Sequence, residues 1–343
     1  MKRACPLVVL LASLGLGQTP PTPKKPLDLI QVLGLPRRGV PSQRSAMPVN
    51  ERGIDLGPNE DYLTTFKTVG TDEVLPGAPH AAKRAEQREA RKHFKRGMKF
   101  ARRKMYAKAE EEYRAALQLD PDSPKVHRAL GYALVVQEKW DLAVAENRTA
   151  TRLQPDYAPA HTNLGIALAK KGDLDAAIVE FRTSLRARPR SVEAHTCLGN
   201  ALCLKGDLDG AVAEYRAALR LRPRYAIART NLGTALDKKG DLDGAITEYR
   251  TAIRHQPDHS DAHNNLGVAL FKKGDLDGAI VQYRTALRLK PDYAEAHNNL
   301  GLALERKGEH RAALEEFRAA QILDPRNPNF VKDYERLLRK TNQ

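Results

Sequence analysis

The fold is decided by the stretch SDAHNNLGVALFKKGDLDGAIVQYRTALRLKPDY, which runs from Ser260 to Tyr293. Its pattern returns along the chain every 34 residues. A proline near the end of each copy marks the period, at Pro121, Pro155, Pro189, Pro223, Pro257, Pro291 and Pro325. A fixed period of this length is typical of stacked repeat architectures. No enzyme motif in the chain is as strong, so the sequence predicts an architecture before it predicts a function.

Within the quoted copy the pattern predicts two helices joined by a tight turn. Residues 260–273 carry apolar side chains at helical spacing. Gly274 is expected to end this first helix, because glycine accepts the left-handed backbone conformation of a helix stop. Asp275 then caps a second helix, which Pro291 ends. One such pair cannot bury its own apolar face, so neighbouring pairs must bury it for each other.

Small and aromatic residues recur at fixed positions of the copy, counted from its first residue. Position 8 is glycine at Gly131, Gly165, Gly199, Gly233, Gly267 and Gly301. Position 20 is alanine at Ala143, Ala177, Ala211, Ala245, Ala279 and Ala313. Position 24 is aromatic at Tyr113, Phe181, Tyr215, Tyr249, Tyr283 and Phe317, with Asn147 as the exception. The small residues mark the places where the two helices must approach closely.

These residues resemble the tetratricopeptide repeat family. The seven copies span residues 90–123, 124–157, 158–191, 192–225, 226–259, 260–293 and 294–327. The resemblance implies an all-α, right-handed superhelical solenoid of seven helix-turn-helix repeats, with a concave groove lined by the first helices. One departure is systematic. Where the family often has tryptophan at position 4, this chain has His93, His127, His161, His195, His263 and His297, and Arg229 in the fifth copy.

The two ends of the chain carry other signals. Residues 1–17 are predicted to be a signal peptide, because a basic start precedes an apolar run too short to span a bilayer. The protein is therefore expected to be exported, to a periplasm or as a secreted protein, with an uncleaved membrane anchor as the alternative. Residues 18–80 are rich in Pro and Gly and predict a disordered linker. Residues 328–343 predict a C-terminal capping helix.

The most basic stretch is 81–104, which begins with an N-terminal extension at 81–89 and carries eleven Lys or Arg against two Glu. One interpretation is contact with an anionic surface such as nucleic acid, polysaccharide or lipid headgroups. The candidate residues are Arg91, Lys92, Lys95, Lys99, Arg102 and Arg103. The alternative, which we favour, is the solvated end of a repeat array. Aromatic residues are sparse here, and export argues against nucleic acid.

The side of the first helix opposite its apolar face is expected to line the groove, with position 5 at the edge. Position 6 holds Asn163, Asn231, Asn265 and Asn299. Position 5 includes Thr162, Thr230, Asn264 and Asn298, and position 13 includes Lys170, Lys238, Lys272 and Arg306. An amide both donates and accepts, so the asparagine row can match the backbone of an extended peptide. The position-13 cations would add a preference for acidic side chains.

The row resembles the asparagine ladder of the binding domain in O-GlcNAc transferases, which implies that it holds a polypeptide. The alternative is that asparagine is merely a good solvated residue. We expect a non-enzymatic scaffold with a protein or peptide partner, and no cofactor, metal or small-molecule substrate. The histidines occur once per repeat, too far apart to share one ion. A second interpretation is a basic tether that binds an anionic polymer or membrane through 81–104.

Overall fold

The computed structural model describes residues 79–341, which form fifteen α-helices and no strand. The predicted all-α array of helix hairpins is therefore confirmed. The signal peptide at 1–17 and nearly all of the linker lie outside the described residues. The described chain divides into two units, 79–197 and 198–341, and the boundary falls within α9 (Val192–Lys205). None of the described helices has the length and apolarity to cross a membrane.

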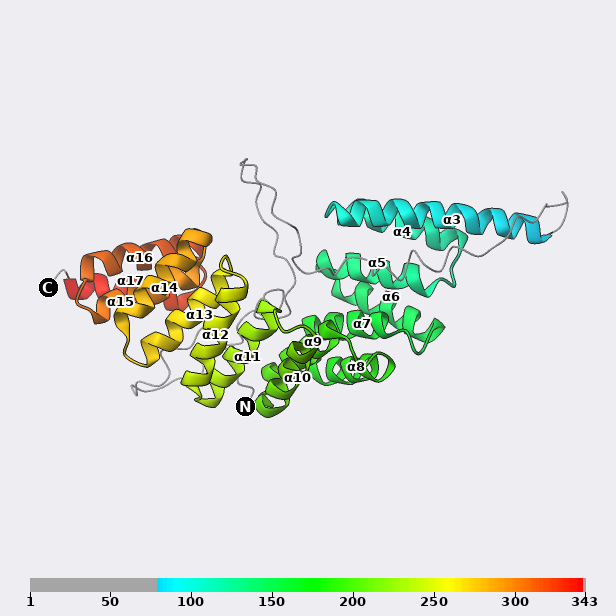
Figure 1. The fold of residues 1–343 in the computed structure, drawn as a ribbon. Helices are drawn as coiled ribbons and strands as arrows, with labels where there is room; N and C mark the ends of the chain where they lie inside the picture. Colours follow the sequence, from blue (N-terminus) through cyan, green and yellow to red (C-terminus); the bar gives the residue numbers. More distant parts are fainter. Residues whose placement is uncertain (1–78, 342–343) are drawn as a thin grey trace. The chain divides into compact units, whose positions relative to one another are not determined.

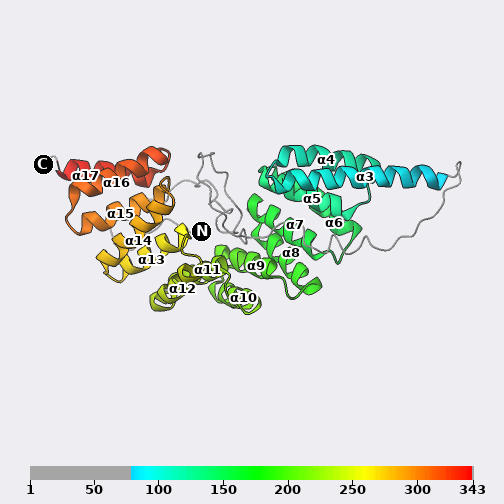
Figure 2. The same ribbon diagram turned by 45° about the horizontal axis from the view of Figure 1, so that its top comes forward.

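The first unit stacks its helix hairpins in chain order (Figures 1 and 2). Its helices are α3 (Pro79–Arg102), α4 (Tyr106–Leu119), α5 (Pro124–Val136), α6 (Trp140–Leu153), α7 (Ala158–Lys171) and α8 (Leu174–Ala187). Each helix packs on the next, and α5 also packs on α7. The basic extension and the first helix of the first repeat form one continuous helix, α3. α3 begins at Pro79, so its first two residues fall within the segment predicted to be linker.

The second unit is built in the same way. It contains α10 (Leu208–Leu221), α11 (Ala226–Lys239), α12 (Leu242–His255), α13 (Ser260–Lys272), α14 (Leu276–Leu289), α15 (Ala294–Arg306), α16 (His310–Leu323) and α17 (Pro328–Thr341). The first helices α11, α13 and α15 contact one another in turn. α17 packs on α16 and buries Phe330 and Leu337, as a capping helix should. The right-handed superhelix of the whole array stays a prediction.

The two helices of a repeat approach closely where glycine faces an aromatic ring. Tyr283 is 1% exposed and lies against Gly267, where a Cβ atom would come within 2.6 Å of the ring. The same contact recurs at the other position-8 glycines. In the second repeat the aromatic residue is replaced by Asn147, which is fully buried and whose Oδ1 has no hydrogen-bond partner. Glycine is needed here because any side chain would hold the helices apart.

The aspartates that occur in pairs along the chain have structural roles. Asp275 caps α14, because its Oδ1 accepts a hydrogen bond of 2.9 Å from the backbone N–H of Gly278. Asp277, two residues later, pairs with Lys307 of the next repeat at 2.8 Å. The same cap recurs at Asp173, Asp207 and Asp241. The repetition of these contacts argues that the paired carboxylates stabilise helices and the stack rather than form a reactive dyad.

The turn inside each repeat requires a left-handed residue at position 15. Five repeats supply glycine there, at Gly172, Gly206, Gly240, Gly274 and Gly308, with φ between 84° and 91°. In the first two repeats Lys104 and Glu138 take the same conformation, with φ of 58° and 62°. A side chain in this conformation costs roughly 1–2 kcal/mol. These two turns are therefore strained relative to the other five.

Relieving this strain should stabilise the first unit. We expect Glu138→Gly to raise the free energy of unfolding by about 1 kcal/mol, less than the full strain because glycine has more freedom in the unfolded chain. Gly172→Ala, the reverse change one repeat later, should lower it by a similar amount. Urea unfolding followed by circular dichroism measures both. No gain from Glu138→Gly would mean that this turn is not left-handed in solution.

Candidate functional site

The position-4 side chains join neighbouring parts of the stack. Nδ1 of His161 lies 2.6 Å from Oε2 of Glu180, on the second helix of the same repeat. Nε2 of the same ring lies 2.9 Å from the carbonyl oxygen of Pro155, at the end of the preceding repeat. A carbonyl can only accept, so Nε2 carries a hydrogen. Arg229 makes the same two contacts in the fifth repeat, to Glu248 and to the Pro223 carbonyl.

This geometry favours the charged imidazole. At His161 the hydrogen bond to Glu180 raises the pKa and outweighs the opposing effect of burial. At His127 and His297 burial opposes the charge most strongly, but the bonds to Glu146 or Glu316 and to a proline carbonyl raise the pKa on balance. Among the described residues no three His, Cys, Asp or Glu side chains gather as a metal site would require. His127, His161 and His297 instead bridge neighbouring repeats, with contacts that favour the charged imidazole.

The position-6 asparagines of the second unit form a continuous row. Each donates a side-chain hydrogen bond to the first helix of the preceding repeat. The pairs are Asn231 to Asn200 at 2.9 Å, Asn265 to Thr234 at 3.4 Å and Asn299 to Asn264 at 3.0 Å. All three asparagines are half-buried. They lie on α11, α13 and α15, which are neighbours, so the structure brings these three predicted residues together in a fixed orientation.

Asn163, in the first unit, behaves differently. It is 9% exposed, and its Nδ2 is buried without a hydrogen-bond partner. Position 9 of the preceding repeat is Tyr132, where the second unit has Asn200 or Thr234. The row of oriented amides is thus a feature of α11, α13 and α15, and Asn163 does not extend it.

The position-5 residues do not line an open groove. Thr162, Thr230, Asn264 and Asn298 are 2–9% exposed. Thr162 Oγ1 lies 2.7 Å from Ser184 Oγ on the second helix, and both hydroxyls bond to the carbonyl of Ala158. Helical side chains lean toward the helix N-terminus, so position 5 covers position 1 and meets the second helix. The sequence placed these four residues at the groove edge, whereas the structure buries them.

The position-13 cations are held by the preceding repeat. Lys272 pairs with Asp237 at 2.6 Å, so its charge is balanced. The guanidinium of Arg306 lies 5.3 Å from the centre of the Phe271 ring, which carries no opposite charge. The other two contacts are Lys170 over Trp140 at 5.6 Å and Lys238 to Cys203 Sγ at 3.6 Å. The pairing of Lys272 with Asp237 therefore reduces, at this one position, the attraction for acidic ligands that the sequence suggested.

The basic candidates near the start of the array are all exposed. Arg91, Lys92, Lys95, Lys99 and Arg102 lie on α3, and Arg103 follows it. Lys92 pairs with Glu89 of the same helix at 2.9 Å, a contact of exposed side chains. These charges face solvent, which both a surface contact and a solvated cap require.

The exposed arginines of the second helices are a feature that sequence reasoning missed. Position 25 is arginine in every repeat, at Arg114, Arg148, Arg182, Arg216, Arg250, Arg284 and Arg318. Position 29 adds Arg152, Arg186, Arg220, Arg254 and Arg288. All of them are exposed. The signal lay in the 34-residue period, because arginines 34 residues apart occupy the same face of successive second helices.

Comparisons with protein families agree with this architecture. A profile described as TPR repeat matches residues 97–137, 199–240 and 269–308. Two profiles described as Tetratricopeptide repeat match 128–182 with 230–283, and 294–327. Together the matches cover 97–182 and 199–327, more than half of the 343 residues. No curated protein sequence matches the chain.

Solved structures with a TM-score above 0.5 show the same fold. One is a chain of the APC/C hetero-tetramer Cut9-Hcn1, which is 19% identical in sequence and has a TM-score of 0.60. The match covers 68% of the present chain and 48% of the Cut9-Hcn1 chain, so the present chain spans about half the length of that relative. A tetratricopeptide repeat protein from Parabacteroides merdae is 16% identical and has a TM-score of 0.60. The match covers 73% of the present chain and 99% of the Parabacteroides chain. YrrB, described as a TPR protein with an unusual peptide-binding site, is 22% identical and has a TM-score of 0.43. The match covers 55% of the present chain and 97% of the YrrB chain.

The repeat period, the stacked helix hairpins and the matching profiles lead to one conclusion. Repeats of this kind typically serve as protein-protein interaction scaffolds and are generally non-catalytic. The chain belongs to the tetratricopeptide repeat family.

Proposed function

We propose that this protein is a scaffold that holds an extended polypeptide along the first helices α11, α13 and α15. The observation that carries the proposal is the row formed by Asn231, Asn265 and Asn299. The three amides sit at the same position of neighbouring helices, are half-buried, and are oriented by bonds to the preceding repeat. A row of this kind is what backbone recognition requires.

The spacing of the row suits an extended chain. Packed helices lie roughly 8–10 Å apart. An extended chain rises about 3.3 Å per residue, so successive asparagines would meet the backbone at about every third residue. An amide has two N–H donors and two acceptor sites, so one bond to the preceding repeat leaves the group able to make others. Recognition through the ligand backbone makes affinity depend on an extended conformation more than on particular side chains.

The charge of this face has a limited role in the proposal. Lys272 is balanced by Asp237, whereas Arg306, at the end of the row, lies over the uncharged ring of Phe271. We therefore expect a modest preference for an acidic side chain near Arg306. Because most of the binding comes from uncharged amides, affinity should fall little as salt is raised.

The test removes the three amides together. A peptide is first selected from a random display library on the full chain, and its affinity is measured by fluorescence anisotropy. Asn231→Ala, Asn265→Ala and Asn299→Ala in one variant should weaken binding about 10- to 100-fold, since each lost hydrogen bond contributes about 0.5–1 kcal/mol.

The matched control removes three polar side chains from the second helices, with Thr183→Ala, Thr251→Ala and Thr285→Ala. These threonines lie outside the proposed face and should leave the affinity unchanged. Circular dichroism must show both variants folded. An unchanged affinity in the asparagine variant would show that the row does not bind the peptide.

A second candidate function is a basic tether at the start of the array. The observation that favours it is the exposure of all six candidate cations on and beside α3. Retention of the full chain on a sulfated polysaccharide column should then fall steeply with salt. Lys95→Glu with Lys99→Glu should abolish retention, whereas the asparagine variant should keep it. Equal retention of both variants would argue against the tether.

We further propose that the protein acts outside the cytoplasm. The support is the predicted signal peptide at residues 1–17. Fractionation of cells that express the full chain tests this directly. Mature protein lacking the first 17 residues in the exported fraction is the expected result, and full-length protein confined to the cytoplasm would contradict it.

A further inference from the structure

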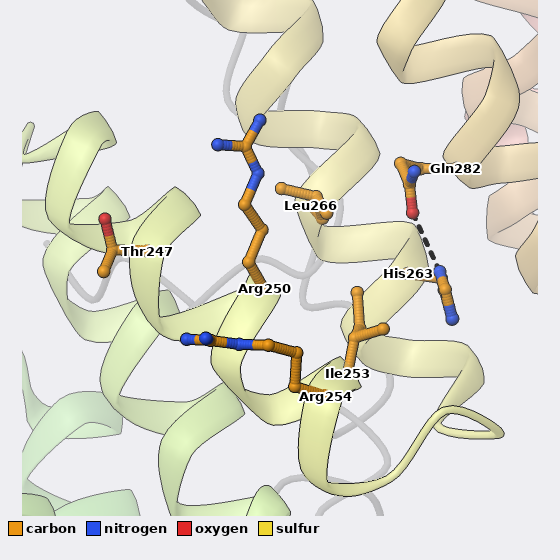
Figure 3. A pocket seen from close by; sticks show the side chains of 7 residues that line it. All are labelled: Thr247, Arg250, Ile253, Arg254, His263, Leu266 and Gln282. Atoms are coloured by element: carbon orange, nitrogen blue, oxygen red, sulfur yellow. Dashed lines mark hydrogen bonds between the residues drawn. The ribbon is translucent and has the colours of Figure 1, made fainter.

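A crevice of about 620 Å³ opens in the second unit between α12, α13 and α14. Its lining residues are Thr247, Arg250, Ile253, Arg254, His263, Leu266 and Gln282. In Figure 3 the apolar side chains of Ile253 and Leu266 lie between the two arginines on one side and the hydrogen-bonded His263 and Gln282 on the other. None of the asparagines of the row lines it, so the crevice is a separate surface.

The arginine side of the crevice is strongly cationic. Arg250 and Arg254 are exposed and one helical turn apart on α12. Within the described residues neither forms an ion pair; Arg254 donates a hydrogen bond of 2.8 Å to Thr251, which carries no charge. The pKa of the neighbouring His255 is lowered, first by desolvation and then by the charges of Arg229, Arg224 and Arg254.

One residue distinguishes this crevice from the equivalent places in the other repeats. Position 23 is glutamate in six repeats, at Glu112, Glu146, Glu180, Glu214, Glu248 and Glu316. In the sixth repeat it is Gln282, whose Oε1 lies 2.8 Å from Nδ1 of His263. The lining therefore contains no carboxylate. The crevice is thus lined by two arginines and by no acidic side chain.

We propose that this crevice binds an acidic peptide, with an apolar side chain on Ile253 and Leu266 and an adjacent carboxylate on Arg250 and Arg254. Charge complementarity selects an anion, and the planar guanidinium can bind a carboxylate through two parallel hydrogen bonds. The apolar floor selects a ligand that also carries an aliphatic group, which polyphosphate and sulfated sugars lack. No aromatic side chain lines the crevice, and single-stranded nucleic acid is usually bound by stacking on such rings.

The experiment measures binding of a fluorescent, glutamate-rich peptide with two leucines to the full chain. Arg250→Gln with Arg254→Gln should weaken binding at least about tenfold, because charged hydrogen bonds are the strong ones. The matched control is Arg284→Gln with Arg288→Gln on α14, which removes the same charge from the next repeat and should change binding less than about threefold.

Gln282→Glu is the sharper variant, because it restores the residue of the other six repeats. It provides His263 with the carboxylate partner found in its equivalents, so the fold should be kept. At about pH 9, where an imidazole is uncharged and cannot neutralise the new carboxylate, binding of the peptide should fall about fivefold or more through charge repulsion. Replacing the leucines of the peptide by serine should also weaken binding to the unaltered chain. The asparagine variant of the first helices should bind the probe normally, which separates this proposal from the proposed function.

Several results would overturn the proposal. Equal losses in the two double-arginine variants would show a diffuse attraction for anions. Tighter binding of polyphosphate or of the serine peptide would show that the apolar floor is not used and that the ligand is a general polyanion. Full binding in Gln282→Glu, or no binding of the probe to the unaltered chain, would show that the crevice is not an acidic-peptide site.

Discussion

Replacing Tyr283 by alanine should lower the free energy of unfolding by about 3–5 kcal/mol, the range for removing a large aromatic side chain from a core. The ring is 1% exposed and fills the space that Gly267 leaves between α13 and α14. Burial also raises the pKa of the Tyr283 phenol, as expected of a ring removed from water. In a repeat array the loss would fall on one repeat and on its contacts with its neighbours.

Urea unfolding and hydrogen exchange measure this effect. Exchange should become faster in α13 and α14 before it does so in distant helices. Tyr283→Phe should be nearly neutral, because Phe181 and Phe317 occupy the same position in other repeats. Val281→Ala is the matched control, since Val281 is 57% exposed on the same helix and should change stability by less than about 0.5 kcal/mol. A Tyr283→Ala variant no less stable than this control would contradict the packing described.

The free energy of unfolding should fall as the pH rises above about 6.5, which is the pKa of histidine in the unfolded chain. The pKa values of His127, His161 and His297 are raised in the folded state. A raised folded pKa means that the folded chain binds protons more tightly than the unfolded chain. The stabilisation is therefore fully present below the unfolded pKa and is lost as the pH passes through the folded values. The three histidines lie in different repeats, so their effects should add.

Arginine at the same positions should remove this dependence. Arg229 already makes the two contacts in the fifth repeat. Arginine as a residue type is charged throughout the pH range in which histidine titrates. A variant with His127→Arg, His161→Arg and His297→Arg should melt at nearly the same temperature from about pH 6 to pH 9. His263→Arg is the control, because His263 faces Gln282 rather than a carboxylate, and it should leave the dependence in place. A flat profile in the unaltered chain would refute the charged bridges.

The sequence predicted the helix hairpins well because each feature of the repeat has a local cause. Gly274 ends a helix, Asp275 caps the next, and Gly267 meets Tyr283, all within one copy of the period. The family resemblance added an expected right-handed superhelix, which stays a prediction. The two left-handed turns at Lys104 and Glu138 could not be predicted, because neither residue favours that conformation and only the neighbouring helices impose it.

The site was predicted less completely. On a helical wheel, position 6 (Asn231) and position 5 (Asn264) fall near the same side of the first helix. Burial, however, depends on where the second helix packs, and a helical wheel carries no information about that contact. Asn264 is therefore 2% exposed, whereas Asn231 is half-buried and lies in the row. The arginines of the second helices do not form a continuous basic run in the sequence, as the residues at 81–104 do, so a search for basic runs does not find them. Counted by repeat position, Arg250 and its equivalents form the most regular charge pattern of the protein.

Hydrogen exchange of the full chain with and without the selected peptide tests the central claim most directly. If the protein holds an extended polypeptide along its first helices, the peptide should slow exchange in α11, α13 and α15, around Asn231, Asn265 and Asn299, and leave α3 unchanged. Protection confined to the second helices or to α3, with none on the first helices, would contradict it.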